Sequence, residues 1–201
     1  MSIPFQDSET AKNLLRAFAG ESQARNRYDF AANLCQKQEL QAMAFIFQAT
    51  AKQEQAHAKV FWDHLQALNG QNLPIYGAYP IEGTNLELLR AAQHNEHEEH
   101  GSVYTSFAAI ATQEGFPEAA ASFRQIAAIE QLHGERFGLL ADQLESGALF
   151  VSQIETGWMC LNCGHTQNSL EAPKQCPVCN HGQGWFIRLE LAPWSPVVKQ
   201  T

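Results

Sequence analysis

The sequence predicts a mainly α-helical protein, in which a four-helix bundle is followed by a small domain built around four cysteines. Residues 1–146 show long stretches with the 3.6-residue hydrophobic period of amphipathic helices. This periodicity ends near residue 150, where Cys, Pro, Gly and Asn become frequent. An internal repeat with an offset of 76 residues relates the two halves of the helical region. We therefore expect a bundle over 1–150 and a separate domain over 156–192.

Composition narrows the classes of function. The chain has 201 residues, a formal net charge of -8 and a pI of about 5.4, so non-specific binding to nucleic-acid phosphates is not expected. No window reaches the roughly 18 apolar residues that span a bilayer. The N-terminus has no basic region before an apolar run, which argues against a secretory signal. We expect a cytoplasmic protein with no membrane partner.

The first two helices are predicted from their caps and periods. Capping side chains at Asp7, Ser8 and Thr10 precede the first helical pattern. A second helix is expected over about 38–68, ending at Asn69-Gly70. The apolar stripe of the first helix contains Leu14, Leu15, Phe18, Tyr28, Ala31 and Leu34.

A long connection separates the second helix from the third. Residues 70–83 contain two prolines and several glycines, and Thr84-Asn85-Leu86-Glu87 then resembles a capping box. The third helix is expected to run to about Glu114, and the fourth from about 117 to 146. One long crossover between the second and third helices is typical of a ferritin-like bundle. A plain up-down bundle with a loose middle loop is the alternative, and helix number alone does not separate the two.

The repeat predicts a site with approximate two-fold symmetry. It carries Tyr28 onto Tyr104, and Glu21 onto His97, which lies between Glu96 and Glu99. The strongest matches pair Phe47, Ala51, Glu54, His57 and Phe61 with Phe123, Ala127, Glu130, His133 and Phe137.

Two Glu-x-x-His motifs within this repeat predict a metal centre. Residues three apart share a helix face, so each motif directs a carboxylate and an imidazole to one point. A solvated helix face would explain a single motif, but each Glu here has a Phe seven residues away on both sides, which indicates a core-facing stripe. Di-iron and di-manganese bundles use two such motifs plus one Glu from each remaining helix. The candidate ligands are Glu21, Glu54, His57, Glu96, Glu99, Glu130 and His133.

The segment from Glu96 to His100 offers more groups than the template needs. Glu96 and Glu99 share a face, and the second carboxylate suggests a ligand that exchanges. Tyr28 and Tyr104 lie near the site face, either as core aromatics or as hydroxyl partners of a ligand. Cys35 is interpreted as a small buried apolar residue. Three further histidines are interpreted as surface residues or neighbours of ligands: His64, His94 and His97.

The second predicted metal site lies near the C-terminus. Two Cys-x-x-Cys pairs are separated by twelve residues, a spacing typical of tetrahedral coordination by four sulfurs. Zinc or iron fits four thiolates, and spacing alone favours zinc. A redox di-metal bundle needs an electron source, which favours iron. The four residues are Cys160, Cys163, Cys176 and Cys179.

The combined motifs resemble the rubrerythrin family. The segment from Ala17 to Tyr28 looks like the opening signature of rubrerythrins, and the order of glutamates and histidines is similar throughout. Cys160-x-x-Cys163-Gly164 with Cys176-Pro177-x-Cys179 resembles the shortened rubredoxin-like domain of that family. The resemblance covers about 10–192. Departures at Ser102-Val103-Tyr104-Thr105 and at Glu39-Leu40 concern local helix geometry only.

The resemblance implies a role for each site residue. Glu54 and Glu130 would bridge two irons, and Tyr28 and Tyr104 would lie beside the ligands. Glu21 would be terminal on the first iron, Glu96 and His133 on the second, and Glu99 would hold the first iron when oxidised, with His57 replacing it on reduction.

The resemblance also implies an activity and partners. Rubrerythrins reduce hydrogen peroxide to water with electrons passed through the four-cysteine iron, in defence against oxidative stress. An external donor, a rubredoxin or a reductase-type protein, would supply the electrons. The family usually forms dimers in which the four-cysteine site of one subunit lies near the di-iron site of the other. The alternatives are a ferritin-like iron oxidase or storage protein with a structural zinc ribbon, and an interaction module with two structural metals.

Overall fold

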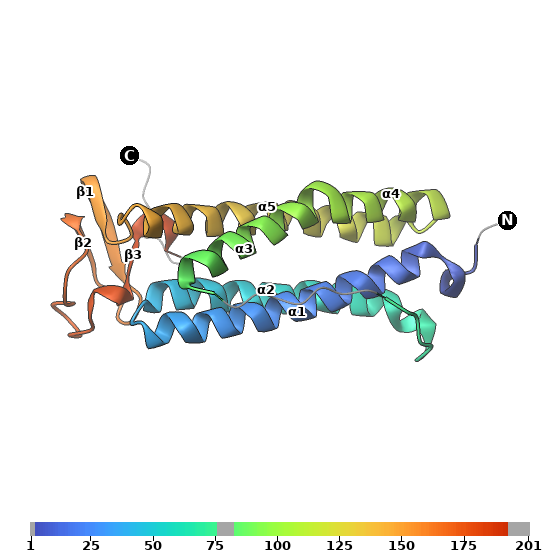
Figure 1. Ribbon diagram of the computed structural model, residues 1–201, viewed down its shortest axis with the longest axis horizontal. Helices are drawn as coiled ribbons and strands as arrows, with labels where there is room; N and C mark the ends of the chain where they lie inside the picture. Colours follow the sequence, from blue (N-terminus) through green and yellow to red (C-terminus); the bar gives the residue numbers. More distant parts are fainter. Residues whose placement is uncertain (1–2, 76–82, 193–201) are drawn as a thin grey trace.

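The protein is an elongated helical bundle with a small β-sheet at one end. The structure, a computed structural model, describes residues 3–75 and 83–192. Figure 1 shows the sheet packed against one end of the bundle and the N-terminus at the opposite end. No helix in the described parts of the chain combines the length and apolarity needed to cross a bilayer. The predicted fold class is confirmed.

The first two helices, α1 (Glu9–Lys37) and α2 (Gln41–His64), form an antiparallel pair. At the start of α1, the Ser8 side chain accepts a hydrogen bond from the Ala11 backbone N–H at 3.0 Å. Between the helices, Glu39 adopts a left-handed backbone with φ 61°. This turn explains why α2 begins three residues later than predicted.

The second helix ends as its sequence predicts. A 3₁₀ turn, Leu65–Leu68, continues α2, and Asn69 and Gly70 then adopt positive φ angles of 47° and 80°. This end of α2 lies far from the sheet, whereas α3 begins near it (Figure 1). The end of α2 and the start of α3 therefore lie at opposite ends of the bundle, as in a ferritin-like bundle. Part of the predicted crossover, 76–82, lies outside the described residues.

The third predicted helix needs a correction. The capping box is present, since Thr84 and Glu87 exchange side-chain and backbone hydrogen bonds at the start of α3 (Asn85–Glu98). The helix is not uniform to Glu114 as predicted. A π-helical segment, Glu99–Val103, separates α3 from α4 (Tyr104–Glu114). Such segments accommodate an extra residue within a helix and are frequent at functional sites.

The last helix, α5 (Pro117–Glu145), packs against α3 and α4. It starts after Gly115, whose φ is 88°, and its first residue is proline, a favoured position because the missing N–H would be unpaired there. α1 and α2 form one layer of the bundle, and α3, α4 and α5 form the other (Figure 1).

Two apolar clusters fill the bundle and leave a polar layer between them. Phe47 and Phe137 belong to the cluster nearer the sheet, and their ring centroids lie 5.2 Å apart. Phe61 and Phe123 belong to the other, also at 5.2 Å. All four rings are buried, so the predicted core-facing stripes are confirmed. The glutamates and histidines of the two Glu-x-x-His motifs lie between these rings on the same faces of α2 and α5, and they are buried as well.

The small domain contains a sheet that the sequence did not predict. Its strands are β1 (Val151–Cys160), β2 (Thr166–Glu171) and β3 (Phe186–Arg188), paired antiparallel in the order β2-β1-β3. Its own core is small and contains Trp158, Cys160, Ala172, Cys176 and Phe186.

The small domain is attached to the bundle through apolar contacts and backbone contacts. Met159 and Ile187 extend the apolar cluster at this end of the bundle. Gly184 lies so close to the α1–α2 turn that an added Cβ would be 1.6 Å from the Glu39 carbonyl oxygen. Only glycine fits at that contact. Residues from Pro193 onward lie outside the described part of the chain.

Candidate metal centres

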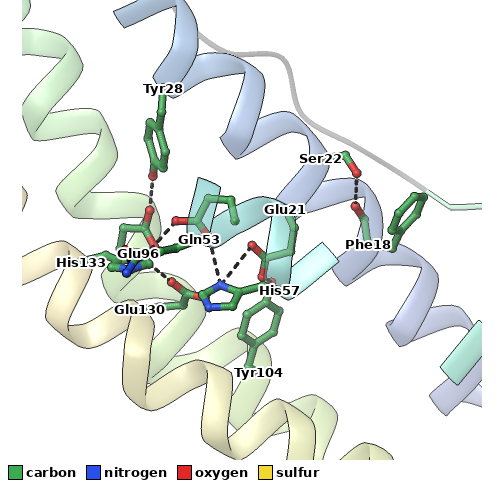
Figure 2. A network of polar contacts seen from close by, with 11 residues as sticks. Phe18, Glu21, Ser22, Tyr28, Gln53, His57, Glu96, Tyr104, Glu130 and His133 are labelled. Carbon is green, nitrogen blue, oxygen red and sulfur yellow. Dashed lines mark hydrogen bonds and ion pairs between the residues drawn. The ribbon is translucent and has the colours of Figure 1, made fainter. Parts of the chain in front are cut away.

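The four long helical segments bring carboxylates and imidazoles into one buried layer (Figure 2). These groups form two overlapping sets, and within each set the ligand atoms lie within 4.8 Å of one another. Glu54 and Glu130 belong to both sets, as bridging ligands between two metals would. The first set is Glu21, Glu54, His57 and Glu130, and the second is Glu54, Glu96, Glu130 and His133.

The two imidazoles occupy nearly equivalent positions. His57 Nδ1 lies 2.8 Å from Glu130 Oε1 and 3.1 Å from Glu54 Oε2. His133 Nδ1 lies 2.8 Å from Glu130 Oε2 and 3.0 Å from Glu54 Oε1. The rings are stacked, with centroids 5.8 Å apart. The 76-residue repeat thus appears in space as a near-symmetric pair of N/O ligand sets.

The burial of this layer indicates that cations belong in it. The carboxylates of Glu21, Glu54, Glu96 and Glu130 are at most 2% exposed. Each has at least one buried oxygen without a hydrogen bond of suitable geometry in the described parts of the chain. Several buried carboxylates facing one another are very unfavourable unless positive charge offsets them. A set of carboxylate and imidazole donors fits iron or manganese, so the residues present fit the predicted di-iron site.

Protons partly offset this charge when no metal is bound. Burial acts to lower the pKa of both histidines, but the interactions that their ring N–H groups make with the surrounding carboxylates outweigh it. These interactions raise the pKa of His57 to about 12 and that of His133 to about 11. Burial raises the pKa of Glu96 to about 8 and that of Glu21 well above its ordinary value. The pKa of Glu54 falls to about 2, because its hydrogen bonds to the histidines outweigh burial. Metal binding must displace the histidine protons.

Two buried tyrosines hold the terminal carboxylates. The Tyr28 hydroxyl donates to Glu96 Oε1, and the Tyr104 hydroxyl donates to Glu21 Oε1 at 2.5 Å (Figure 2). Burial raises the pKa of both phenols well above the ordinary value, so they remain neutral donors. Both rings also pack in the apolar clusters. The sequence left open whether these tyrosines are core aromatic residues or hydroxyl partners of a ligand, and in the structure they are both.

The π-helical segment explains how the second tyrosine reaches the site. Tyr28 follows Glu21 by seven residues, whereas Tyr104 follows Glu96 by eight. In a uniform α-helix the extra residue would turn Tyr104 about 100° away from its equivalent direction. The π-helical segment between them absorbs that residue. The sequence contained a signal of this extra residue, because the repeat offset is 75 from Glu21 to Glu96 but 76 from Tyr28 to Tyr104.

Glu99 lies outside both ligand sets. It is half-buried at the first position of the π-helical segment and lines a cavity of ≈ 230 Å³ with Arg27, Gln23 and Asn95. Burial, followed by the charge of Glu96, raises the pKa of the Glu99 carboxyl. The structure thus places His57, and not Glu99, among the first set of ligand atoms.

One contact of the site was missed from the sequence. Gln53 Oε1 lies 3.0 Å from His133 Nε2, on the side of the ring away from the carboxylates. His64 instead contacts Ser122, and His94 is exposed beside Glu98. His97 lies against Gly134 of α5, where an added Cβ would be 2.4 Å from its ring.

Cys35 is buried among apolar residues and does not belong to the group of four converging cysteines. Burial raises the pKa of its thiol to about 11, which makes it a poor nucleophile and a poor ligand. This agrees with the interpretation of Cys35 as a small apolar residue.

The four C-terminal cysteines converge at the second site. Their sulfurs lie within 4.8 Å of one another, with Cys160–Cys179 and Cys163–Cys176 distances of 3.7 Å and no disulfide. Two equivalent turns present them, in which the Gly164 and Asn180 backbone N–H groups donate to the carbonyl oxygens of Cys160 and Cys176. Gly164 and Asn180 both have positive φ. Four converging sulfurs fit one tetrahedral iron or zinc.

Comparison with known proteins agrees with this geometry. The Rubrerythrin family model matches residues 12–141, and the model of the rubrerythrin rubredoxin-like domain matches 158–187. The chain is 44% identical to a rubrerythrin of Porphyromonas gingivalis, over 92% of each chain. It is 40% identical to a rubrerythrin of Nitratidesulfovibrio vulgaris, over 92% of this chain and 96% of that protein.

Solved structures agree on the fold. A mixed-valence nigerythrin superposes with a TM-score of 0.62 at 24% identity, over 90% of each chain. A bacterioferritin of Mycobacterium tuberculosis gives a TM-score of 0.63 at 18% identity, over 73% of this chain and 90% of that one. The motifs, the two metal-ligand geometries and these relatives lead to one conclusion: the chain belongs to the rubrerythrin family.

Proposed function

We propose that this protein is a peroxidase that reduces hydrogen peroxide to water at a non-haem di-iron site. The reaction consumes one peroxide, two electrons and two protons, and it yields two waters. The observation that carries the proposal is the pairing, in one chain, of two ligand sets that share Glu54 and Glu130 with a separate four-sulfur site. Two irons held by the glutamates and histidines of the bundle would supply both electrons, and an iron held by the four cysteines would supply their replacements.

Each ligand has a proposed role. Glu54 and Glu130 would bridge two metals, because the two oxygens of each carboxylate face different histidines. Glu21 and His57 complete the first position, and Glu96 and His133 complete the second. Tyr28 and Tyr104 orient the terminal carboxylates and neutralise no charge, since both phenols keep their protons.

Glu99 is the proposed exchangeable ligand of the first position. It lies beside the site, at the point where the helix changes from α to π geometry, and the surface cavity reaches it. Burial raises its pKa, so while it is not bound to metal this carboxyl takes up a proton more readily than an ordinary glutamate does. Such a carboxyl can hold a proton close to where the reaction consumes protons.

The proposed partners are a second copy of the chain and an external electron donor. The small domain contacts the α1–α2 turn near Leu40, and Glu54 lies about 20 Å farther along α2 at the helical rise of 1.5 Å per residue. A homodimer that places the small domain of one copy over the bundle of the other would shorten this path. A rubredoxin or a reductase-type protein is the proposed donor, and we propose a cytoplasmic location with no nucleic-acid or membrane partner.

Metal content and visible colour test this proposal. Iron held by four thiolates absorbs visible light and zinc does not. We expect three irons per chain, and a visible spectrum that bleaches with reductant and returns on addition of peroxide. A colourless protein with zinc at the cysteines and no peroxide consumption would contradict the proposal and favour an iron oxidase with a zinc ribbon.

A Glu99→Ala variant tests the proposed exchange. Because Glu99 lies outside both ligand sets, the variant should fold and keep both bundle metals, while peroxide turnover falls at least about tenfold. Stopped-flow measurement of peroxide consumption, with metal content as the control, checks this. Unchanged turnover would remove Glu99 from the mechanism.

A further inference from the structure

One hydrogen bond breaks the symmetry of the di-metal site. Gln53 on α2 reaches across to His133 on α5, with 3.0 Å between Gln53 Oε1 and His133 Nε2. A carboxamide oxygen only accepts, so Nε2 of His133 carries the proton that is donated. Nδ1 of the same ring faces Glu54 and Glu130, so once a metal displaces the Nδ1 proton, the Nδ1 lone pair is directed to the place where that metal would lie.

The internal repeat shows what stands at the equivalent place on the other side. The offset of 76 carries Gln53 onto Ile129, which is 37% exposed. An isoleucine side chain has no acceptor for an imidazole N–H. In the part of the chain that the structure describes, every polar contact of His57 is made by its Nδ1 atom. The His57 ring is therefore held only from the metal side.

We propose that Gln53 is a positioning residue that fixes the tautomer and ring orientation of His133, and that Ile129 leaves His57 without such a partner. The consequence is that two nearly symmetric metal positions differ in affinity. The position served by Glu96 and His133 binds metal more tightly, and the position served by Glu21 and His57 is the labile one. The inference rests on the di-iron site and does not depend on the peroxidase activity.

The physical basis is the cost of orienting an imidazole. A partner on the distal ring nitrogen selects one tautomer and raises ligand basicity, and its loss typically weakens metal binding about 10–100-fold. A ring without that partner must lose rotational and tautomeric freedom when the metal binds. The two positions share both bridging carboxylates, and each has one terminal carboxylate that accepts from a tyrosine. Apart from the exchangeable Glu99 proposed for the first position, the distal contact of the histidine distinguishes them.

Variants at Gln53 test the first half of the proposal. Anaerobic calorimetric titration with Fe²⁺, on protein whose four-cysteine site is already filled, measures the two bundle steps separately. Gln53→Leu should weaken the tighter step about 10–100-fold and leave the weaker step unchanged. Gln53→Glu keeps an acceptor oxygen and should retain most of the affinity. Gln55→Leu, an exposed glutamine two residues along the same helix, is the matched control.

A second readout follows the histidine proton directly. In the diamagnetic zinc-loaded protein, ¹⁵N-resolved NMR should show a slowly exchanging Nε2 proton on His133 and a rapidly exchanging one on His57. Gln53→Leu should make the His133 proton exchange rapidly, without unfolding the bundle. A general loss of packing would instead change exchange at both rings, and that result would overturn the proposal.

The reverse change tests the second half. Ile129→Gln places a carboxamide at the position that the repeat makes equivalent to Gln53, so it should tighten the weaker step and slow exchange of the His57 proton. If the Fe²⁺ titration curves of Gln53→Leu and Gln55→Leu superimpose, Gln53 does not position His133 and the proposal is overturned. An unchanged weaker step in Ile129→Gln would overturn the explanation of the asymmetry. Neither outcome bears on peroxide turnover.

Discussion

The bundle and the small domain hold their metals in different ways. In the bundle, ligands come from helices distant in the sequence, and apolar clusters on both sides of the site pack without any metal. In the small domain, four ligands come from two neighbouring turns, and the domain's own core contains only five fully buried residues. The bundle can thus fold first and bind metal afterwards, whereas the small domain needs its metal as part of its core.

The largest effect expected from this comparison is on the small domain. Cys176→Ser should remove its metal and unfold the region from about Val151 onward, because a structural four-thiolate site contributes most of the folding energy of so small a domain. The helices of the bundle should persist. Limited proteolysis together with far-UV circular dichroism checks both parts.

The matched control uses the remaining cysteine. Cys35→Ala removes a buried thiol from the bundle core, so it should cost about 1–2 kcal/mol of stability and leave both metal sites occupied. A small domain that stayed resistant to protease in Cys176→Ser would show that its packing against the bundle suffices to fold it.

An intermediate effect is expected in the pH dependence of the metal-free bundle. The folded pKa values of Glu96 (about 8), His57 (about 12) and His133 (about 11) all lie above those of the unfolded chain. The folded state therefore binds more protons, and its stability falls as pH rises through these folded values. The lowered pKa of Glu54 acts oppositely, but only in acid, between its ordinary value and about 2.

Thermal unfolding measures this dependence. Between about pH 5 and pH 8 the melting temperature of the metal-free protein should fall by at least about 3 °C. Metal replaces the bound protons, so the metal-loaded protein should show a flatter profile, and its binding should release protons into the buffer. Parallel profiles for the two forms would show that the buried carboxylates and imidazoles do not carry the offsetting charge.

The smallest effect is expected at the two tyrosines. Tyr28→Phe and Tyr104→Phe each remove one hydroxyl that donates to a terminal carboxylate while retaining the buried ring. Each should cost about 1 kcal/mol of stability and tenfold or less in metal affinity, measured by melting and by metal titration. The control is Phe30→Leu, which changes an exposed aromatic residue and should alter neither the melting temperature nor the metal affinity.

Much of the fold could be predicted because its signals are local. The helix period, the capping box at Thr84 and the break at Gly115 act within one or two turns, so they can be recognised without knowing what packs against them. The spacing of four phenylalanines predicted that the Glu-x-x-His motifs face the interior. The rings of these residues are buried, namely Phe47, Phe61, Phe123 and Phe137. Six of the seven candidate bundle ligands lie in the two sets, and Glu99 lies beside them.

Features that depend on two helices at once could not be predicted in the same way. The contact between Gln53 and His133 joins α2 to α5, and no sequence pattern near either residue predicts this contact. The strands of the small domain were also missed, because turns and cysteines dominate its composition and β1 is largely exposed before Gly157.

By itself, the sequence determined the ligand chemistry of both sites, through residue types repeated at an offset of 76 and through two cysteine pairs. Only the tertiary structure decided which of these groups meet. The π-helical segment brings Tyr104 into register with Glu21, His57 rather than Glu99 lies among the ligands, and Gln53 supports one histidine of the pair. The physical reason is that helix register and contacts between helices depend on packing across the whole bundle, whereas periodicity and caps depend only on near neighbours.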